Sequence, residues 1–269
     1  MIELGKEKEM MQQNSSTYST IQTGNSFNLP NLPKKLPITF LNVGIVIPTL
    51  NEEKNIGVIL DGLKSLGFDN ILVIDGRSED CTVEKATKNG AKVILQETKG
   101  KGAAIKQVLN NNYLNADAII LMDADGSMSP EEVPALIKTL ESGADIVKGS
   151  RFLKGGYTQD MSALRRLGNK LMVTAVNALW STNFTDLCYG FIILNKRAIE
   201  NLAPIVESQN FEIETEIVIK AINRGLIVKE VPSVELRRRS GESNLHTFKD
   251  GYRIFRTIFR EFMKPTKGI

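Results

Sequence analysis

Short hydrophobic runs alternate with polar, amphipathic segments from residue 43 to about residue 150. The runs lie at 44–48, 70–75, 91–95, 116–123 and 144–149. Runs of about four to eight apolar residues are typical of parallel strands that are covered on both faces. The segments between them predict helices at about 51–65, 79–89, 101–112 and 130–142. Ser129 precedes Pro130 and two glutamates, so we expect it to cap the last of these helices.

The second half of the chain continues this pattern with a different spacing. It predicts a long helix near 162–180, a strand near 190–194, a helix near 212–224 and two short strands within 226–236. Strands that alternate with helices are joined by right-handed crossovers. The sequence therefore predicts an α/β fold, with one open, mostly parallel, Rossmann-like sheet flanked by helices.

The two ends of the chain depart from this pattern. Residues 1–40 are polar and rich in proline towards their end, which predicts a disordered leader joined by a stiff linker to a folded domain at 41–247. Residues 248–269 predict an amphipathic helix whose aromatic stripe is flanked by lysines and arginines. The stripe consists of Phe248, Tyr252, Phe255, Phe259 and Phe262. Two interpretations remain open: the helix lies on an anionic membrane surface, or the stripe packs on the protein's own core.

Composition excludes several classes of protein. The 269 residues carry 34 Lys+Arg against 31 Asp+Glu, a formal charge of +3, which argues against a strongly basic nucleic-acid-binding protein. A single histidine, His246, excludes a multi-histidine zinc site, and the two cysteines are too few for a disulfide scaffold. No run approaches the roughly 18 apolar residues of a membrane-spanning helix, and no secretory signal is recognisable. We therefore expect a cytoplasmic protein, with the cytoplasmic face of a membrane as an alternative place of action.

Polar or glycine-rich loops follow all five predicted strands of the first half. They lie at 48–52, 75–78, 99–102, 123–126 and 149–151. Ligands of open parallel sheets bind at the carboxyl ends of the strands, so we expect these loops to converge on one site.

Asp123 and Asp125 end a hydrophobic strand, where two carboxylates are costly unless a cation is bound. Carboxylate oxygens suit Mg²⁺ or Mn²⁺, which in turn suit diphosphates. The alternative is that both are ordinary turn or capping residues. Lys101, in a cationic glycine-rich loop that opens a helix, could receive phosphate or belong to a solvated turn.

The remaining candidates each have a structural alternative. Glu52 and Asp75 could contact a ribose or a base, or cap helices. Arg151 could neutralise a diphosphate or form a surface ion pair. The arginine run at 237–239 could clamp phosphate or form a solvated face. Asp186 could be a general base, orient an acceptor or belong to a turn.

Taken in order, these loops resemble family 2 glycosyltransferases, in particular the dolichyl-phosphate mannose synthase and polyprenyl-phosphate glucosyltransferase branch. The resemblance covers residues 43–245 and rests on IPTLNEE, VIDGRSEDCT, KGKGAA, LMDADGSMSPEE, GSRF, TDLCYGF and EVPSVELRRRSGES. It implies a GT-A fold, with a nucleotide-binding half at about 43–150 and an acceptor half at about 151–247.

The resemblance also implies a nucleoside-diphosphate sugar donor and a divalent metal, Mg²⁺ or Mn²⁺, at the DxD motif formed by Asp123, Ala124 and Asp125. It further implies a set of residues around the donor. Those that line the nucleotide pocket are Pro48, Leu50 and Glu52, and those near the diphosphate are Arg151 and Arg238.

The sequence departs from the mannose synthases at four donor-side positions. They are Leu50 in place of an aromatic residue, Gly76 in place of a second aspartate, Ser127 in place of glutamine and Asn244 in place of lysine. These departures favour UDP-glucose, or another UDP-sugar, over GDP-mannose as the donor.

The nature of the acceptor decides whether a base is required. A lipid phosphate is already anionic, so transfer to a polyprenyl or dolichyl phosphate needs no strong base, whereas a hydroxyl acceptor would need a carboxylate, for which Asp186 is the candidate. Direct displacement would invert the anomeric centre. The alternatives are a soluble family 2 enzyme acting on a small-molecule or saccharide hydroxyl, and a non-catalytic sensor of nucleotide sugars. The terminal helix adds peripheral membrane association as an expectation.

Overall fold

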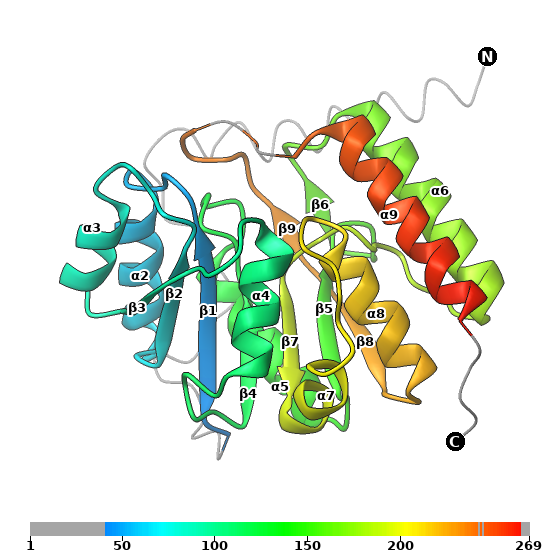
Figure 1. Cartoon of the computed structure of the whole chain (residues 1–269), viewed down its shortest axis with the longest axis horizontal. Helices are drawn as coiled ribbons and strands as arrows, with labels where there is room; N and C mark the ends of the chain where they lie inside the picture. The colour runs from blue at the N-terminus through cyan, green and yellow to red at the C-terminus, as the bar shows by residue number, and fades with distance from the viewer. Residues whose placement is uncertain (1–40, 242, 244, 265–269) are drawn as a thin grey trace. The chain divides into compact units, whose positions relative to one another are not determined.

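The computed structural model describes residues 41–241, 243 and 245–264, and the predicted leader at 1–40 lies outside this part of the chain. The described residues form a seven-stranded sheet in the order β3-β2-β1-β4-β7-β5-β8, flanked by helices (Figure 1). Its strands are β1 (Val43–Thr49), β2 (Ile71–Asp75), β3 (Lys92–Leu95), β4 (Ala118–Leu121), β5 (Ile146–Ser150), β7 (Ile192–Asn195) and β8 (Val228–Pro232). A short parallel pair joins β6 (Tyr157–Thr158) to β9 (Val234–Glu235).

The sheet is parallel apart from β7, which runs antiparallel to both β4 and β5. On the other side of β4, Val46 of β1 pairs in register with Leu121. The prediction of an open, mostly parallel α/β sheet is therefore confirmed. The parallel strands from β1 to β4 place the loops that follow them at one edge of the sheet.

All helices except α7 lie in or near the predicted segments. They are α2 (Ile56–Ser65), α3 (Thr82–Lys88), α4 (Lys101–Asn110), α5 (Val133–Glu141), α6 (Ala163–Trp180), α7 (Lys196–Leu202), α8 (Ile213–Asn223) and α9 (Thr247–Met263). A 3₁₀ turn, η2 (Pro130–Glu132), precedes α5. Neither α7 nor the short strand β6 was predicted.

Two details of the sequence prediction are wrong. The Ser129 hydroxyl hydrogen-bonds the side chain of Glu131 and caps no backbone N–H, because this helix begins with the 3₁₀ turn η2. Strand β3 is partly exposed and not covered on both faces, because it is the edge strand of the sheet.

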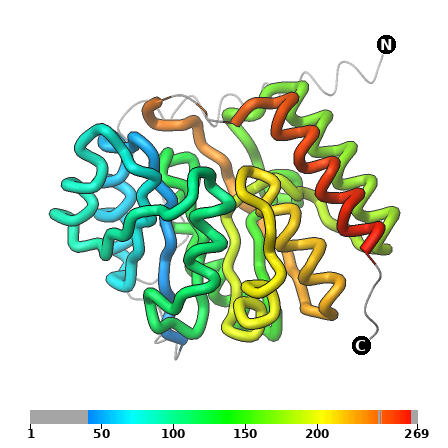
Figure 2. Tube along the Cα trace, in the orientation of Figure 1, coloured from blue at the N-terminus to red at the C-terminus, as the bar shows by residue number. Residues whose placement is uncertain are grey.

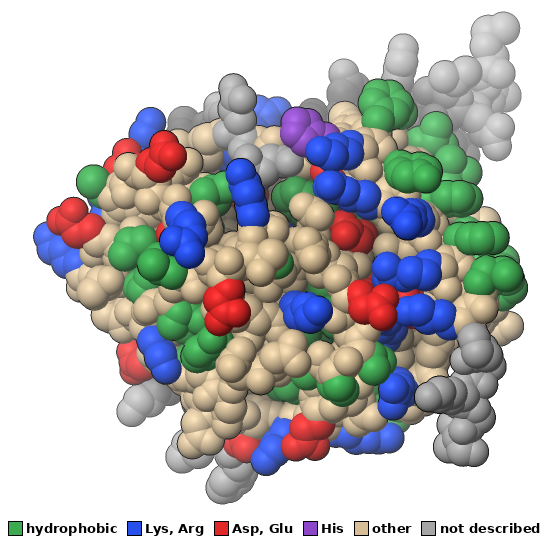
Figure 3. Space-filling model, in the orientation of Figure 1, with side chains coloured by type: hydrophobic (Ala, Val, Ile, Leu, Met, Phe, Trp, Pro, Cys, Tyr) green, Lys and Arg blue, Asp and Glu red, His purple; other side chains and the backbone are tan. Residues whose placement is uncertain are grey.

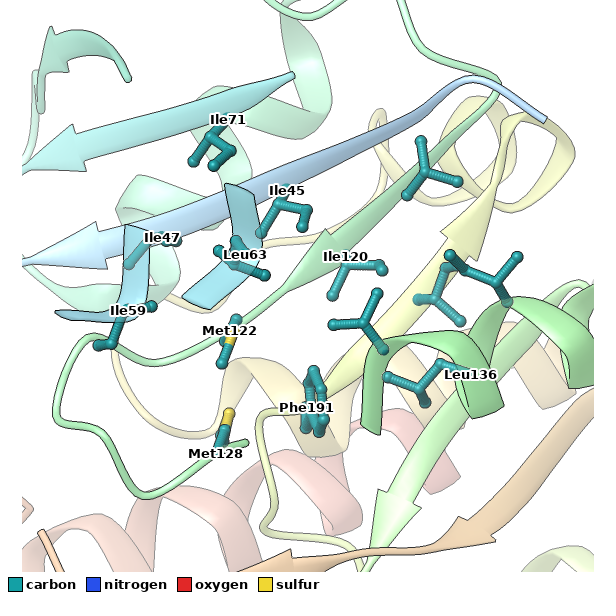
Figure 4. Close-up of a cluster of buried hydrophobic side chains, with 14 of the residues drawn as sticks. Ile45, Ile47, Ile59, Leu63, Ile71, Ile120, Met122, Met128, Leu136 and Phe191 are labelled. Atoms are coloured by element: carbon teal, nitrogen blue, oxygen red, sulfur yellow. The ribbon is translucent and has the colours of Figure 1, made fainter. Parts of the chain in front are cut away.

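Alternate residues of the central strands feed two hydrophobic clusters on opposite faces of the sheet. Ile45 and Ile47 of β1 point to the cluster formed with α2 and α5 (Figure 4), whereas Val46 belongs to the cluster formed with α4, α7 and α8. Because successive side chains of a strand face opposite ways, one apolar run serves both clusters. This packing fixes the strand ends on which the candidate site is built.

A third hydrophobic cluster joins the two longest helices to α8. Helix α9, at the red end of the chain, lies beside α6 (Figure 1 and Figure 2), and Ile254 and Ile258 of α9 pack with Val173 and Val176 of α6. None of the described helices is both long enough and apolar enough to cross a bilayer.

Candidate active site

Most of the residues expected from the sequence line one cleft at the carboxyl ends of β1 and β4. Those expected residues are Pro48, Leu50, Glu52, Lys101, Asp123, Ala124, Asp125 and Arg238. The cleft is also lined by Gly76, which is one of the four donor-side departures, and by Gln96 and Phe211, which were not expected from the sequence. The strand-end loops therefore converge, as the fold class predicts.

Asp75 supports this cleft from inside the protein and does not line it. Its side chain is fully buried. The carboxylate accepts hydrogen bonds from the Thr49 hydroxyl at 2.9 Å, the Ser78 backbone N–H at 2.8 Å and the Ser78 hydroxyl at 2.6 Å. Asp75 thus ties the loop after β2 to the end of β1, a structural role that differs from the helix capping offered as its alternative.

Asp123 is held by a lysine that also contacts a second carboxylate. The Lys101 ammonium lies 2.6 Å from Asp123 Oδ1 and 2.7 Å from Glu214 Oε1. Burial opposes the charge on Lys101, but the two carboxylates outweigh it, so the pKa of Lys101 is raised. Burial raises the pKa of the Glu214 carboxyl. The N-terminus of α4, the end of β4 and the start of α8 meet in this triad.

Asp125 is paired with the middle arginine of the 237–239 run. Arg238 Nη2 lies 2.8 Å from Asp125 Oδ2, and its Nη1 lies 3.4 Å from Glu52 Oε1. The other oxygen of Asp125 accepts the backbone N–H of Ser127 at 2.9 Å. Arg238 Nε is buried without a hydrogen-bond partner. Burial raises the pKa of Glu52.

Arg151 and Asp186 form a closed ion pair, and neither residue lines the strand-end cleft. Arg151 Nε lies 2.7 Å from Asp186 Oδ2 and Nη2 lies 2.9 Å from Oδ1, while Nη1 reaches Glu235 at 2.9 Å. Asp186 is fully buried, and the arginine lowers the pKa of its carboxyl against the effect of burial. Because both oxygens are engaged, this geometry favours a positioning role for Asp186 over the role of general base expected from the sequence.

A second cavity meets the first at the two aspartates. The two cavities share Lys101, Asp123, Asp125, Phe211, Arg238 and Ser243. From there the second cavity continues between α6 and α9, where its apolar lining consists of Met161, Leu164, Met172, Leu245 and Ile254. Polar groups in it include Arg151, Arg165 and Asn169. One side of the aspartate pair therefore faces the strand-end cleft, and the other faces a passage between two helices that is lined in part by apolar side chains.

The chemistry of the aspartate pair fits a divalent metal. Asp123 and Asp125 supply carboxylate oxygens, line both cavities, and keep side-chain exposures of 29% and 12%. Hard oxygen donors of this kind suit Mg²⁺ or Mn²⁺. Elsewhere in the described chain, Glu207, Glu216 and Glu261 also lie close together, but nearby lysines and arginines already neutralise them.

The model of the family described as "Glycosyl transferase family 2" matches residues 44–203. This match spans more than half of the chain. The chain belongs to glycosyl transferase family 2.

Curated relatives of this family 2 chain include two archaeal proteins. A dolichyl-phosphate hexose transferase from Haloferax volcanii is 31% identical over 82% of this chain and 94% of its own length. A dolichol-phosphate mannosyltransferase from Pyrococcus furiosus is 32% identical over 82% of this chain, which spans 63% of that relative's length. The enzyme class, hexosyltransferase, follows from this membership.

Solved structures show the same fold. Glucosyl-3-phosphoglycerate synthase from Mycobacterium tuberculosis, in complex with Mn²⁺, UDP-glucose and phosphoglyceric acid, matches with a TM-score of 0.68 at 20% identity, covering 86% of this chain and 82% of that one. This likeness confirms the GT-A architecture expected from the sequence.

Replacing Gly190 tests the Asp123–Lys101–Glu214 triad. A Cβ at this position would lie 2.8 Å from Lys101 Nζ and 3.0 Å from Glu214 Oε1, so Gly190→Ala must displace the lysine. We expect sugar-transfer activity to fall by about 10²-fold, as for other small misplacements of active-site groups, with little change in the melting temperature. Turnover and thermal unfolding measure the two effects. Gly57→Ala, which meets only the Asn89 amide, is the control, and full activity of Gly190→Ala would contradict the role of the triad.

Proposed function

We propose that this glycosyltransferase moves a hexose from a nucleoside-diphosphate sugar to a polyprenyl or dolichyl phosphate at a membrane surface. The donor is a UDP-sugar such as UDP-glucose in preference to GDP-mannose, and Mg²⁺ or Mn²⁺ is held by Asp123 and Asp125. One observation carries the proposal. The aspartate pair lies where the strand-end cleft meets a passage between α6 and α9 that is lined in part by apolar side chains.

The charges at this junction suit the departure of a diphosphate. A bound metal would neutralise the negative charge that develops on the leaving nucleoside diphosphate. Lys101 and Arg238, which line both cavities, add positive charge on either side of the aspartate pair. An acceptor phosphate is already anionic and needs no general base. The full engagement of Asp186 by Arg151 agrees with this mechanism, in which direct displacement inverts the anomeric centre.

The passage between α6 and α9 suits an acceptor with a hydrocarbon chain. Its mouth between α6 and α9 contains Leu164, which is 51% exposed, and Leu245, and Arg165 lies beside them. The Arg165 guanidinium donates hydrogen bonds to Leu245 O and Thr247 Oγ1, which ties the start of α9 to α6. A polyprenyl chain could lie against the apolar side chains while its phosphate reaches the aspartate pair.

The outer surface of the same two helices supports a lipid environment. We call this surface the two-helix face. Its exposed apolar side chains are Leu164, Leu167, Leu171, Leu179, Phe248, Tyr252, Phe255, Phe259, Phe262 and Met263. Ile254 and Ile258 of α9 are buried instead, so of the two interpretations that the sequence left open, packing of the aromatic stripe on the protein's own core is wrong. A contiguous patch of this kind on a protein surface marks an interaction site.

Positive charges border the two-helix face. Lys249 and Arg256 of α9 are exposed, as is Lys264 directly after it, and hydrophobic and basic side chains lie next to each other along this edge of the molecule (Figure 3). A basic helix with an aromatic face binds the interface of anionic bilayers, because apolar burial and electrostatic attraction act together. We therefore propose an anionic membrane surface as the occupant of this face.

Release of nucleoside diphosphate tests the proposed reaction. We expect turnover of UDP-sugars, and slower turnover of GDP-mannose, only when Mn²⁺ or Mg²⁺ and a short polyprenyl phosphate are both present. Asp125→Asn should abolish this turnover, because it removes a metal-binding carboxylate. Turnover that is indifferent to the lipid phosphate would favour a soluble hydroxyl acceptor, and tight donor binding without turnover would favour a sensor. Full activity of Asp125→Asn would contradict the metal assignment.

Vesicle binding tests the two-helix face. The chain should bind phosphatidylserine-containing vesicles in a salt-sensitive manner, and the double variant Phe255→Ser/Phe259→Ser should bind about 10²-fold more weakly, because two apolar side chains no longer enter the lipid. Co-sedimentation over a range of lipid concentrations measures the partition coefficient. Leu95→Ser, which removes an exposed leucine from β3, is the matched control. Equal partitioning of the double variant and the wild type would contradict this docking surface.

A further inference from the structure

The pairing of Arg238 with Asp125 has a consequence for the order in which ligands bind. We infer that Arg238 is an exchangeable counter-ion: it neutralises Asp125 before metal binds, and it passes to the donor diphosphate when a metal ion takes that carboxylate. This inference rests on the proposed function, because it assumes that the cleft receives a nucleoside diphosphate together with a divalent metal.

The two oxygens of the Asp125 carboxylate have different partners, and Arg238 contacts the one that accepts no backbone N–H. Oδ1 accepts the Ser127 N–H, and Oδ2 lies 2.8 Å from Arg238 Nη2. A metal ion that coordinated Oδ2 would therefore stand next to the guanidinium, and two cations at such a distance repel strongly in a partly buried site. Metal binding at Oδ2 of Asp125 therefore competes with the contact to Arg238.

Lys101 differs from Arg238 because it has a second short ion pair. When a metal takes Asp123, Lys101 retains Glu214 at 2.7 Å. Its ammonium is also confined on one side, since a Cβ on Gly190 would come within 2.8 Å of it. Arg238 retains only the longer contact to Glu52, at 3.4 Å. Of the two cations beside the DxD motif, Arg238 is the one that metal binding leaves poorly satisfied.

Arg238 also has unused donors for a diphosphate. Its Nε is buried without an acceptor, and its Nη2 becomes free when Asp125 is taken by metal. Nε and Nη2 form the two-pronged donor that binds phosphate oxygens in bidentate fashion. The backbone beside it is anchored, because Arg239 N donates to Asp125 O and Leu236 N donates to Ser127 O. The exchange therefore needs movement of the side chain alone.

Formal charges explain why metal and nucleotide should bind together. Glu52, Asp123, Asp125 and Glu214 carry four negative charges, and Lys101 and Arg238 carry two positive charges, which leaves −2. Metal alone must compete with Arg238 for Asp125, whereas metal with a diphosphate offers Arg238 new acceptors. Each ligand should then increase the affinity for the other by the same factor.

Calorimetric titration of the full chain tests the exchange. Three proteins are compared: the wild type, Arg238→Gln and Arg237→Gln. Each is titrated with MnCl₂ alone, with UDP or GDP alone, and with each nucleotide in the presence of MnCl₂. Arg237 is exposed and lines neither cavity, so Arg237→Gln is a control with the same loss of charge. We expect Arg238→Gln to bind Mn²⁺ alone about tenfold more tightly than the wild type, and to bind the nucleotide with Mn²⁺ at least about tenfold more weakly. Arg237→Gln should resemble the wild type.

The variant Arg238→Lys provides a second test. It keeps the positive charge at this position but removes the two-pronged guanidinium donor. It should bind Mn²⁺ alone as the wild type does and bind the nucleotide more weakly. Unchanged or weaker binding of Mn²⁺ to a folded Arg238→Gln protein would overturn the inference, and so would unchanged nucleotide affinity in both variants. A wild-type protein that binds neither metal nor nucleotide would contradict the proposed function itself. A wild type that binds both, with variants that behave identically to it, would contradict only the exchange.

Discussion

The neutralisation of two carboxylates at the end of a buried strand organises the site. Asp123 and Asp125 follow β4 directly and need positive charge nearby, which Lys101 and Arg238 provide. Lys101 also binds Glu214, so the starts of α4 and α8 are held together at the aspartates. Arg238 connects the segment after β9 to the same point. Elements that are distant in the sequence thus meet around one pair of side chains.

Two cavities meet at the aspartate pair, and different elements line them. The loops after β1 and β4 supply charged side chains to the strand-end cleft that suit a nucleotide, whereas the passage between α6 and α9 carries apolar side chains among its polar ones and ends near an exposed apolar face. A soluble donor and a lipid-borne acceptor could therefore approach from different sides without crossing. In this arrangement the helices that shape the acceptor passage are also those proposed to lie on the membrane.

The sequence was sufficient to predict much of this, because the main signals are local. Apolar runs identified the strands, and the fold class then placed the strand-end loops together, which brought Glu52, Lys101, Asp123 and Asp125 into one cleft. The sequence did not decide whether the arginine run at 237–239 clamps phosphate or forms a solvated face. In the structure only Arg238 of this run lines the cleft, while Arg237 and Arg239 are exposed.

The features that the sequence could not supply depend on contacts between distant residues. In the sequence, Glu214 is one of several acidic residues in a predicted helix. Only the packing of α8 against α4 brings it to Lys101. Arg151 and Asp186 have no pattern that identifies them as partners. The terminal helix has an aromatic stripe and a narrow face with Ile254 and Ile258, and its periodicity alone does not say which one is buried.

The most direct test of the central claim asks whether metal and acceptor phosphate meet at the aspartate pair. The ³¹P NMR signal of a short polyprenyl phosphate can be recorded with the protein and UDP, in the presence of Mn²⁺ or of diamagnetic Mg²⁺. The account predicts strong broadening by Mn²⁺ in the wild type and little in Asp125→Asn, which also serves as the control for direct binding of Mn²⁺ to the free lipid. Equal line widths with Mn²⁺ and Mg²⁺, or equal broadening in both proteins, would contradict it.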